Sequence, residues 1–245
     1  MFKLFLLVLL GATSIYGAES VAIPTMNFEL SAPSSPQQLV SSLNVLVLLT
    51  LLFLAPSMVL VMTTFTRFVI VFGFLRQALG TQQVPPTQLL VMLAMILTFF
   101  VMEPVGTKAY ENGIKPYIEE KIGYEEAFDK TALPFKNFMI RNTREKDLAL
   151  FFRIRKMENP TTVADVPLST IIPAFVISEL KTAFEIGFLL FLPFLVIDMV
   201  VASILMSMGM MMLPPIMIAL PFKILVFILI DGWNLLIGNL IASIK

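Results

Sequence analysis

The sequence predicts an all-α, membrane-associated protein built from two long kinked helical hairpins and a small amphipathic helical insert. Three observations lead to this fold class. The 245-residue chain is 58% hydrophobic and only 14% charged, whereas a soluble domain is typically about half apolar and about a quarter charged. Its apolar residues are concentrated in long runs, as in integral membrane proteins. Prolines interrupt those runs and are expected to kink or end the helices.

The composition also excludes whole classes of function. The chain contains no cysteine and no histidine, which removes disulfides, thiolate and imidazole metal sites, and histidine acid–base catalysis. It shows neither a glycine-rich phosphate loop nor a GxSxG motif, so only carboxylate chemistry is left open. We therefore predict a non-enzymatic protein with no catalytic residue, no metal and no cofactor. The 17 basic and 17 acidic side chains balance, and this charge does not favour nucleic acid as a partner.

The first 42 residues are expected to be separate from the helical body. Residues 1–18 carry one lysine, a short apolar stretch and then small residues, which is typical of a cleavable signal peptide. A first membrane span is the alternative, although the apolar stretch is shorter than the roughly 20 residues that a spanning helix needs. Residues 19–42 contain several prolines and a serine cluster and predict a polar leader.

Residues 43–105 predict the first helical hairpin. A helical run from Leu43 to about Arg76 leads through the turn QALGTQQVPPTQ into an apolar helix from Leu89 to Val105. Residues 106–167 mix charges of both signs with three of the four tyrosines, and we expect a small helical insert that packs on its neighbours. One helix face of the insert is expected to carry four side chains: Leu148, Phe151, Phe152 and Arg155.

Residues 168–245 predict the second helical hairpin. As one helix with about 1.5 Å rise per residue, the apolar run from Ile171 to Gly209 would span roughly 58 Å, against a hydrocarbon core of about 30 Å. We therefore expect this run to kink at Pro173 and Pro193 or to lie partly outside lipid. Another apolar helix follows from Pro215 to Ile230. If the signal peptide is removed, four crossings place the insert outside the cell membrane and the turn between the last two helices inside.

Several charged side chains lie in or beside the apolar runs: Arg67, Glu179, Lys181, Glu185, Asp198 and Lys223. A charge at the bilayer centre costs at least about 2.5–3.5 kcal/mol, so these residues imply partners or water. Lys181 and Glu185, four residues apart, can share a helix face. Asp198 and Lys223 lie at matching depths in an antiparallel hairpin. They predict a structural ion pair, within the hairpin or across a subunit boundary, with a proton relay or a role in pore assembly as alternatives.

A methionine loop joins the last two predicted helices in the stretch MGMMMLPP. Gly209 suits the left-handed residue just past a helix end, and Pro214 and Pro215 suit the first turn of the next helix. The connection between them is entirely apolar and contains three consecutive methionines: Met210, Met211 and Met212. Methionine is flexible and polarizable, so these side chains predict gap-filling in a hairpin core or, in a ring of subunits, a compliant gasket. Without further information, gap-filling is favoured.

Three long segments of the chain resemble the FliP/SctR family, the export-gate subunits of flagellar and virulence type III secretion systems. They are PAFVISELKTAFEIGFLLFLPFLVIDMVVASILMSMGMMMLPP at 173–215, ALPFKILVFILIDGWNLLIGNL at 219–240, and PSMVLVMTTFTRFVIVFGFLRQALGTQQVPPTQLLVMLAMILTFFVMEP at 56–104. The second of these is similar to the last helix of the family. The leader and the charged insert together resemble the flagellar branch.

The resemblance implies an all-helical protomer that forms a protein pore. About five copies would wind into a shallow ring with FliQ-type and FliR-type subunits, beside FlhB-type and FlhA-type export proteins. Unfolded flagellar proteins would be the substrates. The assembly would belong to the inner membrane and the flagellar basal body, in contact with membrane lipid and with much of it on the periplasmic side. A raised assembly of this kind puts the four-crossing topology in doubt.

By the same resemblance, Met210, Met211 and Met212 would form the gasket that narrows the lumen, which reverses the preference for gap-filling. The charged residues would then be contacts within or between subunits. An ion-coupled secondary transporter or channel that uses buried Asp198 and Lys223 is the alternative function. An assembly scaffold that never conducts is a third.

Overall fold

The computed structural model describes residues 36–81, 84–156, 162–163, 165–210 and 212–245. The described residues form helices and no strand, so the all-α prediction is confirmed. The predicted signal peptide, and the predicted leader up to residue 35, lie outside the described residues. The chain divides into two compact units, Met1–Leu49 and Thr50–Lys245. Of the first unit, only the beginning of one helix is described.

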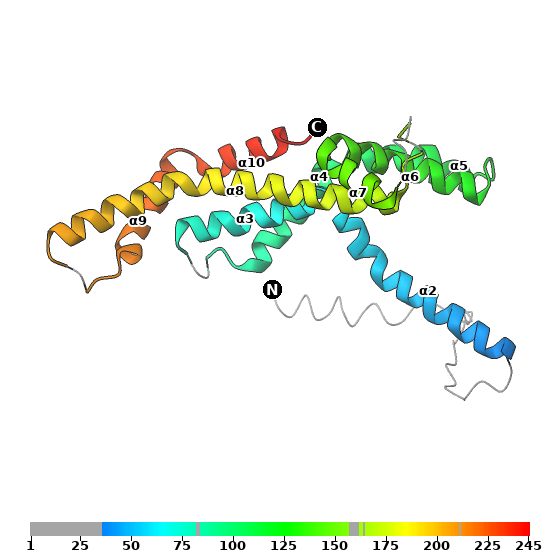
Figure 1. The fold of residues 1–245 in the computed structure, drawn as a ribbon, viewed down its shortest axis with the longest axis horizontal. Coiled ribbons are helices and arrows are strands. Elements are labelled where there is room, and N and C mark those ends of the chain that lie inside the picture. Colours follow the sequence, from blue (N-terminus) through cyan, green and yellow to red (C-terminus); the bar gives the residue numbers. More distant parts are fainter. Residues whose placement is uncertain (1–35, 82–83, 157–161, 164, 211) are drawn as a thin grey trace, which may run out of the picture. The chain divides into compact units, whose positions relative to one another are not determined.

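The helices follow one another along the chain as α2 (Pro36–Val61), α3 (Phe65–Leu79), α4 (Thr87–Ala109), the π-helix η1 (Tyr110–Ile114), α5 (Lys115–Ile118), α6 (Tyr124–Asn142), α7 (Glu145–Arg155), α8 (Leu168–Ser207), α9 (Pro215–Leu229) and α10 (Gly232–Ala242) (Figure 1).

The helical run expected from Leu43 to about Arg76, with its character broken at Pro56 and Arg67, is two helices, α2 and α3. The first begins at Pro36, inside the predicted leader, and ends at Val61. Thr63 lies in the break, where its hydroxyl donates to the carbonyl of Leu60 at 2.7 Å and accepts from the amide of Phe65 at 3.4 Å. Threonine side chains that bond to nearby backbone compete with helical hydrogen bonds. Local chemistry therefore ends α2 where hydropathy alone predicts continuation.

The helix expected over Leu89 to Val105 is α4, which extends through Ala109 and continues through η1 and α5. The first hairpin and the predicted insert thus share one helical stretch, Thr87–Ile118. Within the insert, α7 carries the predicted face: Phe152 is buried, and Leu148 and Phe151 are half-buried. Arg155 is exposed instead and donates to the hydroxyls of Ser169 and Thr170. The predicted stop at residues 158–160 lies outside the described residues.

The second hairpin consists of α8 and the bent pair α9 and α10. Pro173 and Pro193 lie inside α8 without ending it, and the helix has 40 residues. The segment that resembles a single last helix is divided, because α9 and α10 meet at an angle of 65°. Asp231 stands at the bend with a φ of 50°. Aspartate adopts this left-handed conformation more readily than most residues, and it ends the helix there.

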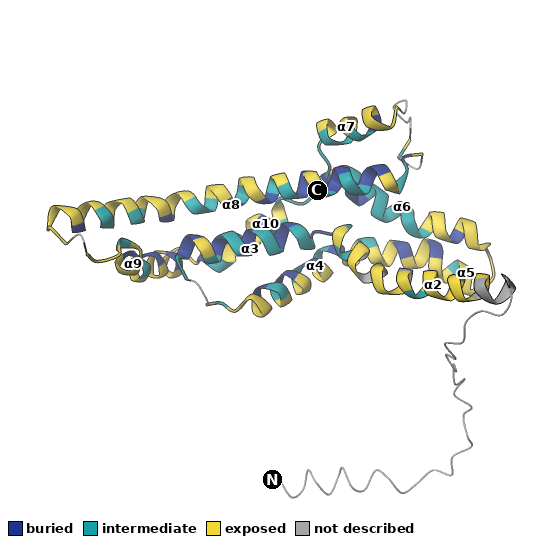
Figure 2. Ribbon diagram, turned by 60° about the horizontal axis from the view of Figure 1, so that its bottom comes forward, coloured by how far each residue is buried: buried dark blue, intermediate teal, exposed yellow. Residues whose placement is uncertain are grey.

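Two hydrophobic cores hold the second unit together. One is formed by residues of α3, α4, α8, α9 and α10, around Phe68, Phe72 and Leu75. The other joins α4, α6 and α7 to the beginning of α8, around Met139 and Phe175. Figure 2 shows buried positions gathered where these helices meet, while the end of α8 that leads to α9 carries mostly exposed positions.

Two helical stretches among the described residues are long and apolar enough to cross a membrane, namely Thr87–Ile118 and Leu168–Ser207. The bent pair α9 and α10 would make a third if it acted as one span. The four crossings expected from hydropathy are therefore not matched within the part of the chain that the structure describes, since the first expected crossing is divided into α2 and α3.

Candidate functional site

The methionine loop begins at a well-defined helix end. The amide of Met210 donates to the carbonyl of Leu205 at 3.0 Å, and the amide of Gly209 donates to the carbonyl of Met206 at 3.1 Å. Together with the φ of 75° at Gly209, these two bonds form a Schellman motif, which satisfies carbonyls at the end of the helix. Gly209 is thus needed for its left-handed backbone. These two hydrogen bonds and the glycine determine the conformation of the turn.

The loop ends at the proline pair. Pro214 is the residue just before α9, with an extended backbone, and Pro215 is the first residue of the helix. Proline is favourable at this position because its missing N–H would have no helical partner there. The amide of Met217 donates to the carbonyl of Pro214 at 3.1 Å. The sequence therefore fixes both ends of the loop, and only the residues between them are free to serve another purpose.

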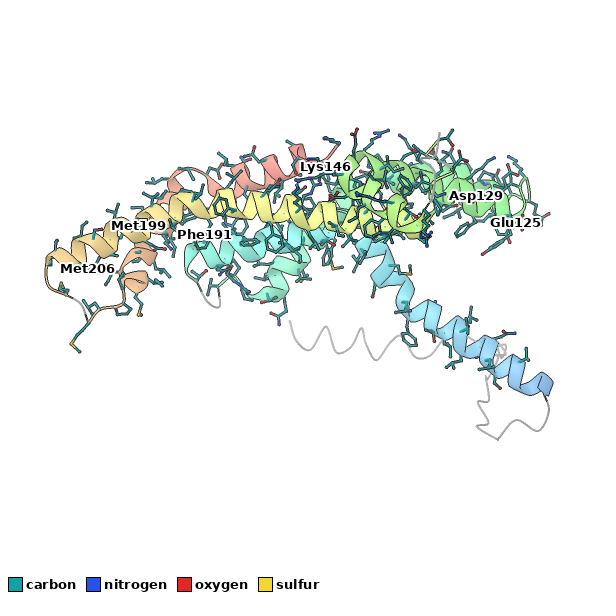
Figure 3. All side chains as sticks on the ribbon, in the orientation of Figure 1. Glu125, Asp129, Lys146, Phe191, Met199 and Met206 are labelled. Atoms are coloured by element: carbon teal, nitrogen blue, oxygen red, sulfur yellow. The ribbon has the colours of Figure 1, made fainter. Side chains whose placement is uncertain are left out.

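The two described methionines of the loop, Met210 and Met212, are exposed. Met212 is 98% exposed and Met210 is 40% exposed, while Met211 lies outside the described residues. The neighbouring methionines on α8, Met199 and Met206, are also exposed (Figure 3). Connections between helices normally run over the surface and meet water, so exposed methionine side chains in a connection are unusual. Since Met210 and Met212 are exposed, gap-filling within the hairpin of a single chain does not account for them.

The Lys223 ammonium on α9 joins three helices. It contacts the Asp198 carboxylate on α8 at 2.6 Å and donates to the carbonyl of Ala78 on α3 at 3.0 Å. Lys223 is only 2% exposed. The second carboxylate oxygen of Asp198, Oδ1, is buried without a hydrogen-bond partner in this chain. The pair that the sequence predicted at matching depths therefore lies within the α8–α9 hairpin, with one acceptor unused.

The Arg67 guanidinium on α3 forms a more complete network. Its Nε donates to Oε2 of Glu179 on α8 at 2.7 Å, and its Nη2 donates to Oε1 at 2.5 Å. Its Nη1 donates to the hydroxyl and the carbonyl of Ser243 at 2.8 and 3.0 Å. Both charged side chains are buried, and bidentate geometry of this kind is the strongest form of an ion pair. The network ties α3, α8 and the segment after α10 together.

Glu185 has a different partner from the one that its spacing suggested. It accepts from Arg144, just before α7, at 2.6 and 3.1 Å, and none of the ion pairs among the described residues includes Lys181, which is exposed. The hydrogen bond that Arg144 donates to Glu185 raises the pKa of Arg144 above its ordinary value. The Arg144 guanidinium offers two donors to the Glu185 carboxylate, which makes this contact between elements the ion pair of Glu185.

Sequence reasoning missed the junction beside this pair. The amide of Arg144 donates to the Ser178 hydroxyl at 2.9 Å, and that hydroxyl donates to the Asp147 carboxylate at 2.6 Å. These contacts fix the beginning of α7 on α8. A serine at a buried position of an otherwise apolar helix was the available signal, since such hydroxyls normally require a partner.

The fold and the site together define a class: an all-helical protein with helices apolar enough for a membrane, tied internally by buried ion pairs and ending one hairpin in an exposed methionine loop. The model of the FliP family matches residues 48–240. The chain is 53% identical over 210 residues to flagellar biosynthetic protein FliP of Bacillus subtilis (strain 168), which covers 86% of this chain and 95% of that protein.

Two further relatives with the same description extend the match over almost the entire chain. The protein of Caulobacter vibrioides is 49% identical over 234 residues, covering 96% of this chain and 87% of that protein. The protein of Rhizobium meliloti is 44% identical over 244 residues, covering 99% of this chain and 98% of that protein. The chain belongs to the FliP family of flagellar biosynthesis and export proteins, which have membrane helices.

Proposed function

We propose that the protein is a pore-forming core subunit of the flagellar type III export gate. It passes unfolded flagellar proteins across the bacterial inner membrane, and its methionine loop contributes to a gasket that seals the lumen. The observation that carries this proposal is the exposure of an apolar loop whose two ends are rigidly specified: Met212 is 98% exposed although Gly209, Pro214 and Pro215 fix the turn around it.

The hairpin that carries the loop supports an assembly of several subunits. An open cavity of about 400 Å³ between α8 and α9 is lined only by apolar side chains, among them Val200, Ile204 and Phe222. Exposed apolar surface on this scale marks contacts with other proteins or with lipid. We propose that further copies of this chain, about five in all, cover it together with FliQ-type and FliR-type subunits. FlhB-type and FlhA-type proteins complete the partners, at the flagellar basal body and largely on the periplasmic side.

The domain organisation belongs to the same proposal. Residues 1–18 act as a signal peptide and residues 19–42 as a leader. The hairpins of residues 43–105 and 168–245 build the gate, and residues 106–167 form a periplasmic insert. A non-enzymatic role agrees with this organisation, because the family is one of export-apparatus subunits.

The surroundings of Lys223 do not support the alternative of a transporter that uses Asp198 and Lys223. The ammonium is enclosed by a carboxylate and a backbone carbonyl and is almost completely buried, as is typical of an ion pair that fixes packing. A relay would need both groups to face a path for water or substrate.

A permeability experiment tests the gasket. Cells in which Met210, Met211 and Met212 are all replaced by alanine are expected to admit a small dye that wild-type cells exclude, because alanine cannot close the space that three flexible side chains fill. The control replaces two exposed methionines elsewhere, Met58 and Met95, and is expected to leave the cells sealed. Native mass spectrometry of the extracted complex verifies that both variants assemble. Unchanged permeability in an assembled loop variant would contradict the gasket.

A further inference from the structure

A second site lies in the groove between α4, α6 and the segment after α10. The groove has a volume of about 820 Å³, within the range of about 300–1,000 Å³ that ligand pockets usually have. Buried and half-buried apolar side chains form its floor, including Val101, Val105, Phe138 and Ile244. The groove shares no residue with the methionine loop or with the ion pairs of Arg67 and Lys223.

The rim of the groove is basic. Lys108 from α4, Lys130 and Arg141 from α6, and Lys245 after α10 line it, and no carboxylate side chain does. Lys130 also contacts Glu126 of its own helix at 2.8 Å, while the ion pairs among the described residues include neither Lys108 nor Arg141. Four cationic residues, from α4, α6 and the segment after α10, therefore line one opening. This arrangement is suited to an anion.

The position of the rim along α4 identifies the kind of anion. The apolar stretch from Leu89 to Val105 is roughly 25 Å long as a helix, which approaches the thickness of about 30 Å of a hydrocarbon core. In an α4 that crosses a membrane, Lys108 would follow one turn later, at the level where lipid headgroups begin. Glu103, the one carboxylate between Leu89 and Lys108 in the sequence, does not line the groove.

An exposed apolar strip leads along α4 into the groove. Leu89, Met92, Ile96 and Phe100 are each more than half exposed, and Phe100 also lines the groove. Successive members of this strip are three or four residues apart, so they follow one face of the helix. A ligand with a long apolar part and an anionic head fits this surface. Its apolar part would cover the strip, and its anionic head would contact the basic rim.

We propose that the groove binds an anionic phospholipid, with its phosphate among Lys108, Lys130 and Arg141 and an acyl chain along α4. Basic pockets beside membrane helices recognise anionic headgroups in this manner. The proposal places the apolar segment of α4 against lipid, whereas α8 faces other subunits. An acidic segment of a second copy, such as the start of α6 with Glu125 and Asp129 (Figure 3), offers charge but no apolar part for the strip and the floor.

The test compares lipid retention by the full chain purified in a neutral detergent. Dioleoylphosphatidylglycerol or dioleoylphosphatidylcholine is added, and native mass spectrometry measures the fraction of protein that holds lipid. The groove variant combines Lys108→Gln, Lys130→Gln and Arg141→Gln. The matched control removes three exposed positive charges outside the groove: Lys146→Gln, Arg153→Gln and Lys156→Gln. Circular dichroism verifies that the helical content is unchanged.

Wild-type protein and control are expected to prefer phosphatidylglycerol, and the groove variant is expected to bind it at least about tenfold more weakly, since each basic group near an anionic headgroup contributes to binding. Lys108 and Arg141 are exposed, and the single substitutions Lys108→Gln and Arg141→Gln should each weaken lipid binding by a smaller factor. These single variants keep the test decisive if the triple variant fails to fold. Equal binding by groove variant and control, or no preference between the lipids, would overturn the proposal. The proposal would also be overturned if the groove variant retained lipid as the wild type does but changed the number of copies in the complex, because the groove would then be occupied by a second copy of the chain.

Discussion

The two halves of α8 differ sharply in what covers them. The first half, residues 168–187, contains eight buried residues, among them Phe175, Glu179 and Gly187, whereas the second half, residues 188–207, contains only Phe194 and Leu205. Apolar side chains make up 11 of the 20 residues in the first half and 16 of the 20 in the second. A helix that is apolar all round is normally buried on every side. The first half buries one face within its own chain, whereas the more apolar second half needs a covering of lipid or of other subunits from outside it.

The ion pairs that Glu179 and Asp198 of α8 form show the same contrast. In the first half, both carboxylate oxygens of Glu179 accept from Arg67. In the second half, Asp198 uses one oxygen for Lys223 and leaves Oδ1 without a partner in this chain. Buried polar atoms nearly always have a partner. The polar groups thus agree with the apolar surface. Within the protomer, the side chains of the first half of α8 have partners, whereas those of the second half leave polar and apolar groups without them.

Removing Glu179 is expected to have the largest effect on the protomer. Glu179→Leu leaves the buried Arg67 guanidinium without its carboxylate and should lower the free energy of unfolding by about 3–5 kcal/mol. Thermal unfolding, followed through the fluorescence of Trp233 in the packed core beside Phe72 and Phe227, measures the loss. The control is Glu185→Gln on the same helix, where the pair with Arg144 is largely exposed and the cost should stay within about 1 kcal/mol. Similar losses for the two variants would show that burial does not distinguish them.

Neutralising Asp198 ranks second. Asp198→Asn leaves the Lys223 charge with one neutral partner and the Ala78 carbonyl, and the free energy of unfolding should fall by about 2–3 kcal/mol. The double variant Asp198→Asn with Lys223→Gln removes the unpaired charge and should recover part of that loss. It should also retain protein export in a motility assay. Abolished export in a stable, assembled double variant would instead favour a relay through the pair.

A methyl group at the boundary between the two halves is expected to have a smaller effect. A Cβ at Gly187 would lie 2.4 Å from a ring carbon of Phe74 on α3, so Gly187→Ala must displace that ring and should cost about 1–2 kcal/mol. Gly73→Ala is the matched control, because a Cβ there meets nothing within 4 Å and alanine favours the helix. Thermal unfolding of both variants measures the difference, and a Gly187→Ala protein as stable as the control would refute the close approach of α3 and α8.

The smallest effect on the protomer is expected in the second half of α8. Phe188 and Met199 are each 62% exposed, so Phe188→Ser and Met199→Ser should change the free energy of unfolding by no more than about 0.5 kcal/mol. The same changes remove apolar contacts with neighbouring subunits and should lower the yield of the assembled complex on size-exclusion chromatography. Stable protomers that assemble as well as the wild type would argue that this half is not an assembly surface.

Hydropathy and spacing predicted the helical class and the positions of most helices, because long apolar runs without strand periodicity leave few alternatives. They did not predict the division at Thr63 or the bend at Asp231, since each depends on a single residue whose local hydrogen bonds or backbone conformation end a helix within an apolar run. The matching depths of Asp198 and Lys223 could be inferred because a short turn joins their helices. Arg144 could not be assigned to Glu185 in the same way, because 41 residues and a change of helix separate them.

Oxidation of methionine by dilute hydrogen peroxide tests the central claim most directly. The second half of α8 and the methionine loop are proposed to be open in the chain alone and covered in the assembled gate. Peptide mass spectrometry should find Met199, Met206 and Met212 rapidly oxidised in the chain expressed by itself and strongly protected in the complex. Met139, which is fully buried, should stay protected in both and serves as the internal control. Equal oxidation of the loop and of α8 in the two samples would contradict the account.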